Sequence, residues 1–422
     1  MRTTGTKWPR RPLKRLAWIK QGQSPPSAEC SESGPGPAFL QGNAEFGERH
    51  PTPRLYCSTP PKRAQEGDLL LSVRAPVGAL NVADRVYGIG RGLCAIQVRS
   101  ELLGSFLFYY LDDLGRHALS RGATGSTFDS VTGDDVAGLS IPLPPLPTQR
   151  AIASYLDRET ARIGTLIEKK ERLLELLEEK RTALITRAVT KGLDPDVPMK
   201  DSGVEWLGEV PAHWEVVRIN HLGRRESGHT PDRKHPEYWD GGIPWVSLND
   251  SSRLREVDVI EETTYEISPL GLANSSARLL PRGTVVFSRD ATVGLCGILG
   301  REMAVSQHFV GWVCGGRVLP DFLLLVLRHS KPQLERLTMG ATISTIGLSD
   351  IALLLSPVPP TDEQARIVHS STEAARKIDA LSARITRAIA LLKEYRSALI
   401  SAAVTGQIEV PDAPEQTAPS GA

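Results

Sequence analysis

Apolar residues recur with alternating spacings of three and four in two long segments of the chain, which lie about half its length apart. This spacing is the seven-residue repeat of a coiled coil. It predicts a seam in the second segment formed by Ile378, Leu381, Ile385, Ala388, Leu392, Tyr395 and Leu399. The matching positions of the first segment are Ile163, Leu166, Lys170, Leu173, Leu177, Lys180 and Leu184. A long helix with such a stripe needs a partner, so we expect the two helices to pair antiparallel, with a globular part at each end.

Two lysines, Lys170 and Lys180, interrupt the apolar stripe of the first helix. One interpretation places them at a solvated edge of the seam. The other gives them a role in fixing the register of the pair or in facing an acidic partner. The pattern leaves both interpretations open.

A proline-rich segment precedes each predicted helix, PLPPLP in the first case and PVPP in the second. Proline fixes the backbone, so each segment predicts a stiff, extended connection. The first helix is expected from about 149 to 190, with Gly192 as its stop, and the second from about 362 to 404, with Gly406 as its stop. Thr361 and Gln364 have the spacing of a capping box at the start of the second helix.

The whole chain is a repeat of one module of about 210 residues. Five pairs of segments match in the same order at offsets of 206 to 218 residues. They are Trp8…GQSP with Trp214…GHTP, GDLLLSVRAPVG with GTVVFSRDATVG, GATGST with GATIST, PLPPLPTQRAI with PVPPTDEQARI, and RTALITRAVTKG with RSALISAAVTGQ. Two copies are too few for a solenoid and suit a molecule with two equivalent working ends.

Each module begins with about 150 residues of mixed character. DLLLSV and TVVFS are typical of strands, whereas SFLFYYLDDLGRHALS and DFLLLVLRHSKPQLERL are typical of helices, the second broken at Pro332. The predicted fold is α+β, with two globular domains joined by a long antiparallel two-helix coiled coil and an internal pseudo-twofold repeat. The expected segments are 1–148 (first globular domain), 149–192 (central helix), 193–360 (second globular domain), 361–406 (C-terminal helix) and 407–422 (a disordered tail).

Composition and charge narrow the class of protein. The five cysteines have no CxxC or metal-ligand spacing, and the longest apolar runs are far too short for a membrane span, so we expect a cytoplasmic protein without a disulfide framework. Net charge is +4 in residues 1–148, +3 in 149–192, −5 in 193–360 and −1 in 361–422. If the protein binds DNA, the second globular domain must do so through a local basic patch, because the net charge of this domain is negative.

No catalytic motif emerges from the chain. GxxxxGK[ST], HExxH and GxSxG are absent, as is the Asn/Asp-Pro-Pro-aromatic segment of amino-methyltransferases. The GIGRG segment at 88–92 lacks the GxGxxG spacing and is expected to form a hairpin turn. The histidines at 213, 221, 229 and 235 lack a metal-like spacing. A two-headed repeat without a catalytic constellation favours recognition or assembly over catalysis, and no metal site is predicted.

The order of these motifs resembles a known family. A globular part ending in a Gly-Ala-Thr loop is followed by IPLPPLPTQRAIASYLD, by RTALITRAVTKGL, and by SGVEWLGEVPAHWEVVRI opening a second globular part. From about Trp8 to Ile408 the chain is similar to the specificity (S) subunit of Type I restriction–modification systems. The combination is specific, whereas each piece alone is weak.

The resemblance implies that each globular part is a target recognition domain that reads one half of a split double-stranded DNA sequence, while the helices set the gap. It also implies docking of two modification (methyltransferase) subunits and of restriction (translocase/nuclease) subunits. The chain itself would then hold no catalytic residue and no cofactor, since S-adenosylmethionine, ATP and Mg²⁺ would belong to the partners. The alternative is a two-headed coiled-coil adaptor that binds proteins, which the net −5 of the second domain favours slightly.

Candidate DNA contacts lie in matched loops, where hydroxyl groups and arginines suit phosphate or base-edge contacts. They are Arg74, Arg121, Thr124, Ser126, Thr127, Arg289, Thr342, Ser344 and Thr345. The alternatives are a structural turn for the Gly-Ala-Thr loops, which cannot read different bases while sharing a sequence, and solvation for Arg74 and Arg289. Trp8 and Trp214 are expected to pack as anchors at the start of each domain rather than to stack on bases. The base-reading loops are expected in the poorly matched stretches, such as 26–66 and 232–282.

Overall fold

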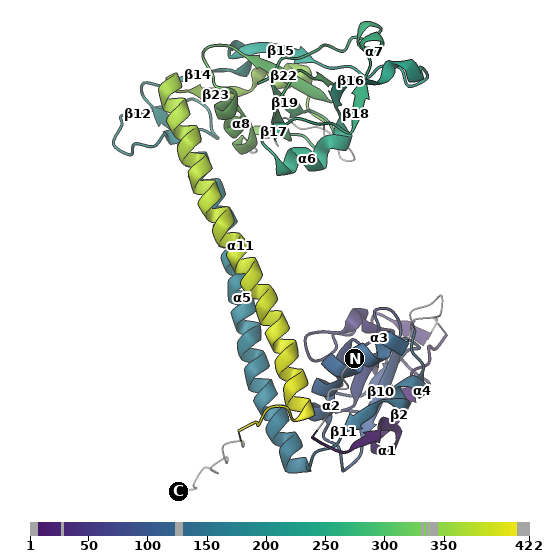
Figure 1. Cartoon of the computed structure of the whole chain (residues 1–422). Coiled ribbons are helices and arrows are strands. Elements are labelled where there is room, and N and C mark those ends of the chain that lie inside the picture. Colours follow the sequence, from purple (N-terminus) through teal and green to yellow (C-terminus); the bar gives the residue numbers. More distant parts are fainter. Residues whose placement is uncertain are drawn as a thin grey trace. The chain divides into compact units, whose positions relative to one another are not determined.

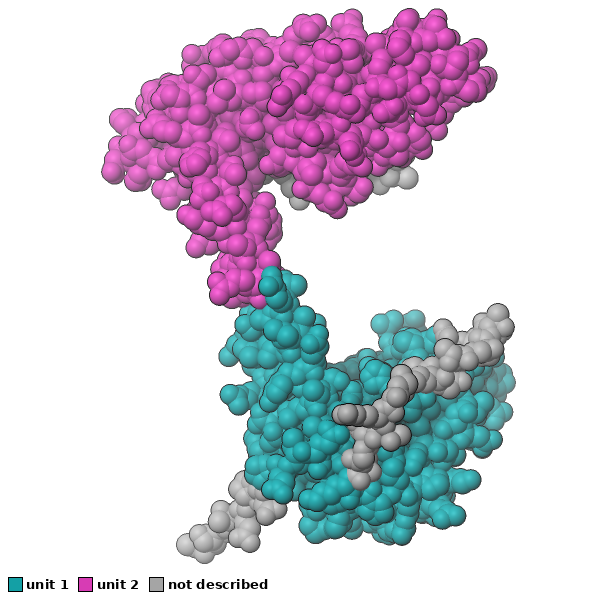
Figure 2. Space-filling model, in the orientation of Figure 1, with its two compact units in different colours: residues 1–171, 386–422 teal, residues 172–385 magenta. Residues whose placement is uncertain are grey.

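The computed structural model describes residues 7–26, 29–122, 130–330, 333–334, 337 and 345–411, without the side chains of residues 120–122. The chain divides into two compact units (Figure 2). Unit 1 comprises Met1–Glu171 and Thr386–Ala422, and unit 2 comprises Arg172–Ile385. Each unit therefore contains one globular domain together with one half of each long helix.

Unit 1 is built around a four-stranded antiparallel sheet with the order β2-β10-β7-β8 (Figure 1). Its strands are β2 (Ala17–Gln21), β7 (Leu69–Ser72), β8 (Leu80–Val82) and β10 (Leu93–Val98). A second sheet, ordered β3-β5-β4-β9-β6, consists of β3 (Cys30–Ser31), β4 (Ala38–Leu40), β5 (Leu55–Cys57), β6 (Arg63–Ala64) and β9 (Tyr87–Ile89). The remaining elements are β1 (Arg10–Pro12), α1 (Leu13–Leu16), a 3₁₀ turn η2 (Asn43–Glu45), α2 (Gly104–Tyr110), a π turn η3 (Leu111–Gly115), α3 (Arg116–Gly122), α4 (Gly133–Gly138) and β11 (Ser140–Pro142).

Unit 2 repeats this plan with a five-stranded sheet ordered β15-β22-β19-β20-β17. These strands are β15 (Gly223–Ser227), β17 (Val259–Ile260), β19 (Val285–Ser288), β20 (Cys296–Leu299) and β22 (Phe309–Cys314). A three-stranded sheet contains β16 (Trp239–Val246), β18 (Tyr265–Ile267) and β21 (Ala304–Val305). The other elements are β12 (Met199–Asp201), β13 (Glu209–Pro211), β14 (Glu215–Arg218), η4 (Ile219–His221), η5 (Pro236–Tyr238), η6 (Leu248–Asp250), α6 (Ser251–Glu256), α7 (Pro269–Ala273), α8 (Pro320–His329), α10 (Leu348–Leu353) and β23 (Leu355–Val358).

The two cores confirm the repeat at the level of packing. In unit 1, Phe106 and Leu107 of α2 are fully buried in one cluster with the side chains of β7 and β10. In unit 2, Phe322 and Leu323 of α8 occupy the equivalent place beside β19 and β22. The predicted strands and helices of both modules are therefore present, and α8 ends at His329, before Pro332, which lies outside the described residues.

Two long helices, α5 (Leu146–Lys191, 46 residues) and α11 (Thr361–Thr405, 45 residues), pair antiparallel. In unit 1 the first turns of α5 share a core with the last turns of α11, and Lys393 lies 3.5 Å from Glu171. In unit 2 the last turns of α5 share a core with the first turns of α11, and Arg181 lies 3.0 Å from Asp379. The two units together give opposite chain directions, which confirms the antiparallel coiled coil.

The seam of the pair matches the predicted one at some positions and is shifted by one residue at others. The predicted members that are buried or half-buried are Ile163, Lys170, Leu177, Ile378, Ile385, Ala388, Leu392 and Leu399. The predicted members that are exposed are Lys180 and, by 42–57%, Leu166, Leu173, Leu184, Leu381 and Tyr395. The residues directly C-terminal to these exposed positions are buried or half-buried instead: Ile167, Leu174, Arg181, Ile185, Ser382 and Arg396. This correction has a physical cause, since Arg181 and Arg396 pair with acidic groups, Asp379 at 3.0 Å and Asp112 at 3.4 Å.

Glycines end both helices, as expected, at Gly192 and Gly406, each with a φ of 74°. This left-handed conformation is the usual helix stop that glycine permits. A Cβ at Gly192 would lie 3.2 Å from Trp214, and one at Gly406 would lie 2.8 Å from Trp8. Each tryptophan therefore packs against the end of a long helix, which is the anchoring role predicted for it.

The capping box predicted at the start of α11 is wrong. The helix begins at Thr361 itself, and the Gln364 amide is engaged elsewhere. Its Oε1 accepts from the backbone N–H of Leu319 at 2.8 Å, and its Nε2 donates to the carbonyl oxygens of Arg317 and Pro359, both at 2.9 Å. The side chain is thus needed to hold the globular domain against the helix and is not available to cap it.

The C-terminal segment begins as ordered structure. Ile408 and Val410 pack against the core of unit 1, so residues 407–411 are not part of a disordered tail. The rest of the predicted tail, 412–422, lies outside the described residues. Among the helices that the structure describes, none is at once long enough and apolar enough to cross a membrane.

Candidate nucleic-acid interface

Four loops of unit 1 converge at one end of its sheets, and backbone hydrogen bonds hold them together. The N–H of Gly22, just after β2, donates to Leu93 O at 2.9 Å. The N–H of Gly90, in the turn between β9 and β10, donates to Leu40 O at the end of β4 at 2.8 Å. The N–H of Val73, just after β7, donates to Gly92 O at 3.0 Å. The loop positions are therefore fixed by the strands that precede them.

These loops surround an open hollow of about 340 Å³ in unit 1. Its lining consists of Gln41, Gly42, Asn43, Ala44, Glu45, Ser72, Arg74, Ala75, Arg91 and Gly92. Arg74 and Arg91 are exposed, and among the described residues neither guanidinium has a hydrogen-bond or ion-pair partner. Glu45 is only 9% exposed, and its carboxylate accepts from the backbone N–H of Gly42 at 3.4 Å. Unit 1 thus presents two unpaired cations at the rim of a rigid loop cluster.

Unit 2 contains the same hydrogen-bonded frame. The N–H of His229 donates to Val305 O at 3.1 Å, as that of Gln23 donates to Ile89 O at 2.9 Å in unit 1. The N–H of Ser306 donates to Val246 O at 2.9 Å, which reproduces the bond from Gly90 to Leu40. The N–H of Arg289 donates to His308 O at 2.9 Å, which reproduces the bond from Val73 to Gly92 in unit 1. The frame is therefore part of the duplicated module.

The turn after β7 is likewise copied after β19. Ser72 Oγ donates to Arg74 O at 2.9 Å, and Ser288 Oγ donates to Asp290 O at 3.0 Å. Arg74 forms a backbone β-bridge with Ser130, and Asp290 forms the equivalent one with Thr345. These bonds make Arg74 equivalent to Asp290, Val73 to Arg289, Arg91 to Gln307 and Gly92 to His308.

A glycine is required where the first loop of each cluster crosses the turn before β10 or β22. A Cβ at Gly22 would lie 2.1 Å from Gly90 O, and one at Gly228 would lie 1.8 Å from Val305 O. Real Cβ atoms do not approach a carbonyl oxygen so closely, so only glycine allows the two backbones to touch. This explains the glycine in both the GQSP and the GHTP motifs.

The side chains on the two frames differ. In unit 2 a polar chain runs across the turn: Thr230 Oγ1 donates to Gln307 Oε1, Gln307 Nε2 lies 3.3 Å from His308 Nε2, and His308 Nδ1 lies 2.8 Å from Asp290 Oδ2. The His308 side chain is 36% exposed and that of Asp290 is 18% exposed. One backbone frame therefore carries arginines in unit 1 and an amide–imidazole–carboxylate chain in unit 2.

The sequence-predicted contacts fall on this interface unevenly. Arg74 lies at the rim of the hollow, and Thr345 is half-buried beside Asp290. Arg289 turns back toward its own unit, where its Nε donates to Ile346 O at 3.3 Å. Arg121 closes α3, but its side chain is not described, and the remaining candidates lie outside the described residues: Thr124, Ser126, Thr127, Thr342 and Ser344.

Four residues of these loop clusters were not singled out by the sequence: Arg91, Asp290, Gln307 and His308. The signal was present, because the offset of 216 residues that aligns Gly67 with Gly283 also aligns Arg91 with Gln307. The motifs do not reveal it, because GIGRG (88–92) and its counterpart AVSQH (304–308) have no residue in common.

The poorly matched stretch 232–282 includes an arm of unit 2 built on β16 and β18 (Figure 1). Strand β16 has eight residues, whereas its counterpart β4 has three. On this arm Trp239 packs edge-on against Trp245, with ring centroids 5.3 Å apart, and the Arg233 guanidinium lies 5.8 Å from the centre of the Trp239 ring. Cations beside aromatic rings at a loop cluster are typical of surfaces that meet nucleic acid.

Each globular domain is fixed to the helices by equivalent groups. Gln149 of α5 is fully buried; its Oε1 accepts from Leu103 N at 2.7 Å, and its Nε2 donates to Glu101 O and Pro144 O at 3.0 and 2.9 Å. Gln364 makes the same three bonds in unit 2. The loop clusters are therefore mounted on the helices through a duplicated joint.

A second contact in unit 1 links Arg49, Asp157 of α5 and Tyr109 of α2. Arg49 Nη1 donates to Asp157 Oδ1 at 2.9 Å, and Tyr109 Oη donates to the same oxygen at 2.7 Å. Burial raises the pKa of Tyr109 to about 12, so its hydroxyl stays protonated and serves as a donor. This joint adds a charge-assisted contact that resists rotation of the domain on the helix.

Comparison with known proteins identifies the architecture. The family model for the Type I restriction modification DNA specificity domain matches residues 7–176 and 211–389, once for each module. The chain belongs to this family. The first range begins just before Trp8 and the second just before Trp214, and each extends into a long helix. The family domain therefore coincides with the structural repeat.

Individual relatives agree with the family. A protein of Methanocaldococcus jannaschii named for the type I restriction enzyme MjaX specificity subunit is 40% identical over 173 residues, which are 41% of this chain and 40% of the relative. The type I restriction enzyme EcoBI specificity subunit of Escherichia coli is 20% identical over 335 residues, 76% of this chain and 69% of that protein. The chain thus spans about two fifths of the length of the M. jannaschii relative.

The fold also matches a solved structure. A chain from work on complex assembly and conformational transition of the type I R-M system superimposes with a TM-score of 0.76 at 17% sequence identity, covering 96% of this chain and 99% of that one. At this identity the likeness concerns the fold. It supports the α+β specificity-domain fold with long paired helices over nearly the whole chain.

Proposed function

We propose that this protein is the DNA specificity subunit of a Type I restriction–modification complex and reads a bipartite duplex, one half with each unit. The observation that carries the proposal is the loop frame, which occurs twice with the same hydrogen bonds and with different side chains. A frame that is kept while its exposed groups change is what two related readers of different base sequences require.

The proposal gives the chain no chemistry of its own. Methylation and cleavage would be carried out by modification and restriction subunits, which would hold S-adenosylmethionine, ATP and Mg²⁺. The protein would act in the cytoplasm, where its DNA target lies. The alternative of a protein-binding adaptor receives no support from the relatives, whose names are those of specificity subunits.

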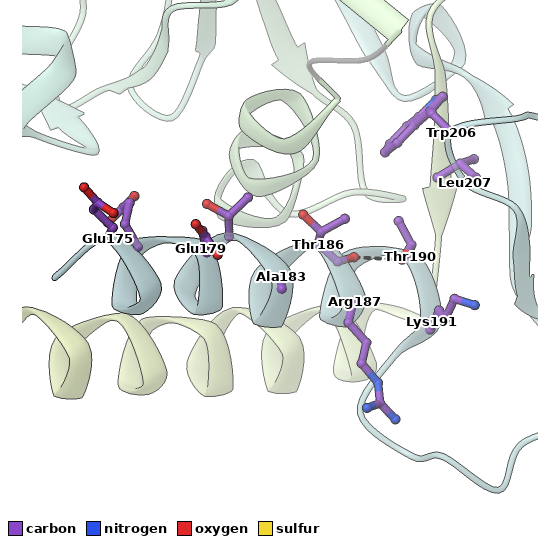
Figure 3. Close-up of a pocket in the computed structure, with 11 residues that line it drawn as sticks. Glu175, Glu179, Ala183, Thr186, Arg187, Thr190, Lys191, Trp206 and Leu207 are labelled. Atoms are coloured by element: carbon purple, nitrogen blue, oxygen red, sulfur yellow. Dashed lines mark hydrogen bonds between the residues drawn. The ribbon is translucent and has the colours of Figure 1, made fainter. Parts of the chain in front are cut away.

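The outer face of α5 in unit 2 supports the docking of partner subunits. Figure 3 shows the lining of an open groove of about 990 Å³ along this face. Ala183 and Thr186 lie on the helix, while Trp206 and Leu207 approach from the segment that follows it. Nearby, Leu173, Leu176 and Leu184 are 42–44% exposed. Apolar surface of this kind is typical of protein–protein interfaces.

The proposal is tested by the adenine methylome of the source cell with and without this gene. Loss of methylation at one split motif, two short halves around a fixed gap, is the expected result. In parallel, the full-length chain purified with its modification subunits should select that motif from randomised duplexes. An unchanged methylome together with no selected motif would overturn the proposal. Ala183→Arg should reduce co-purification of the modification subunit, whereas Lys169→Glu on the same helix should not.

A further inference from the structure

We propose that Gln307 reads an adenine in the half-site bound by unit 2, and that Arg91, at the equivalent position of unit 1, reads a guanine in the other half. This assignment rests on the proposed function, because it names which bases the two loop clusters recognise. It concerns one pair of equivalent positions. The structure gives the backbone bonds that make them equivalent, the exposure of both side chains and the hydrogen bonds of the Gln307 amide.

The equivalence of the two positions follows from backbone contacts. Arg91 directly precedes Gly92, whose carbonyl oxygen accepts from Val73 N–H at 3.0 Å. Gln307 directly precedes His308, whose carbonyl oxygen accepts from Arg289 N–H at 2.9 Å. Each also lies against the residue two after the glycine of the first loop: the Arg91 N–H donates to Ser24 Oγ at 3.4 Å, and Gln307 contacts Thr230. Both side chains are exposed. The frame therefore presents them in the same place.

The polar chain in unit 2 fixes the orientation of the Gln307 amide. Asp290 accepts a hydrogen bond from His308 Nδ1–H, and in this tautomer Nε2 is the acceptor of the ring. The group that donates to Nε2 is then the Gln307 amide nitrogen. On its other side, Gln307 Oε1 accepts from the Thr230 hydroxyl. Each of these three contacts joins a donor to an acceptor, so the direction of the amide is determined by its neighbours.

This arrangement leaves Gln307 with two hydrogen-bonding groups that the contacts of the chain do not use. One amide N–H remains, since the other faces His308, and one lone pair of Oε1 remains, since the other faces Thr230. In the major groove adenine offers an N6–H donor and an N7 acceptor, which complement a carbonyl and an N–H side by side. Guanine offers two acceptors there, O6 and N7, so its O6 would face the Gln307 carbonyl oxygen and be rejected.

Unit 1 presents the opposite chemistry at the same place. Arg91 has only donors, and its guanidinium matches the two acceptors of guanine. Glycine at 92 removes the imidazole that orients Gln307 in unit 2, and Arg74 replaces the carboxylate of Asp290. Glu45 lines the same hollow, but its nearly buried carboxylate accepts from Gly42 N–H and forms no ion pair with Arg91.

The test is selection of bound sequences from a randomised duplex library by the full-length chain in complex with its modification subunits. Gln307→Ala should reduce the adenine preference at one position of one half-site by roughly 5- to 150-fold. Gln307→Arg should change that position from adenine to guanine. Arg91→Gln should relax one guanine in the other half. Arg282→Gln, an exposed arginine at the opposite end of β19, serves as the control and should leave both halves unchanged.

His308 acts through Gln307 and is a positioning residue. His308→Ala should weaken preference at the same base pair as Gln307→Ala and at no other, and the double variant should lose no more than Gln307→Ala alone. In each variant the unchanged half-site reports that the protein is folded and bound. A purely structural role of His308 would instead weaken selection across the whole half-site.

The outcomes separate this assignment from the proposed function. If the unaltered complex selects a bipartite motif and Gln307→Ala and Gln307→Arg select the same motif with the same stringency, the assignment is overturned while the function stands. Loss of selection over the entire half-site in both variants also contradicts it, because one base contact should affect one base pair. If the unaltered complex selects no motif, the proposed function fails, and this assignment fails with it.

Discussion

The buried amide of Gln364 offers the sharpest test of how the globular domains are mounted on the helices. Replacement by leucine keeps a similar volume and removes three hydrogen bonds, to Leu319 N, Arg317 O and Pro359 O. The bond to Pro359 O is buried and the other two are partly buried. A buried group without a partner costs about 1–3 kcal/mol and a partly solvated bond about 1 kcal/mol. We therefore expect Gln364→Leu to lower the free energy of unfolding of unit 2 by about 4 kcal/mol.

The assay is thermal unfolding of the full-length chain followed by circular dichroism. Because the chain has two compact units, each is expected to give its own transition. For a unit of this size about 4 kcal/mol corresponds to a fall of about 8–16 °C in one transition. Gln149→Leu makes the same change in unit 1 and should shift the other transition by a similar amount.

A surface glutamine provides the matched control. The side chain of Gln65 is exposed, and its own bond to Asp68 is made by the backbone N–H, so Gln65→Leu removes no side-chain contact of this kind. Gln65→Leu should shift the unfolding transition of unit 1 by about 2 °C or less. If Gln364→Leu shifted its transition no further than Gln65→Leu, the three hydrogen bonds would not be the joint that we infer.

Three further predictions concern buried groups and a backbone crossing. Burial raises the pKa of the Cys94 and Cys296 thiols to about 12, so both should react with Ellman's reagent very slowly at pH 8 in the native protein and at once after denaturation. Gly228→Ala puts a Cβ 1.8 Å from a carbonyl oxygen and should cost about 3 kcal/mol or more in urea unfolding, whereas Gly316→Ala, with open space around its Cβ, should cost about 1 or less. Burial also lowers the pKa of His329, so the unfolded chain binds the extra proton more readily. Stability should then hold above about pH 6.5 and fall as the pH is lowered, and His329→Gln should flatten the difference between pH 7.5 and 5.5.

The features of the fold that could be predicted from the sequence are those that depend on residues close together in the chain. Helix stops at Gly192 and Gly406, strands such as β7 and β19, and the two-module plan follow from spacing and from residues that permit few conformations. The seam could not be assigned fully from the sequence. In a seven-residue repeat, the second inward residue can lie either three or four residues after the first. Counting apolar residues selects Leu381, whereas the folded pair places Ser382 inward.

The wrongly assigned leucines are informative about assembly. Leu166, Leu173, Leu184 and Leu381 are 42–43% exposed, so the helix pair leaves part of its apolar surface uncovered. A sequence pattern cannot distinguish a leucine that packs between the two helices from one that contacts a further subunit, because both recur every three or four residues along a helix. The proposed docking of modification subunits gives these exposed positions a partner.

The interface residues escaped prediction for a different reason. The search for repeats compares what two modules share, and the shared residues are those that build the frame: Gly22 with Gly228 and Ser72 with Ser288. Residues that read different bases must differ between modules, so they are invisible to a search for matches. The hydrogen-bonded frame shows which positions of the two modules are equivalent, and in the proposed assignment Arg91 and Gln307 are such a pair. For a duplicated recognition protein, conserved bonds therefore locate the interface, and the mismatches within it carry the specificity.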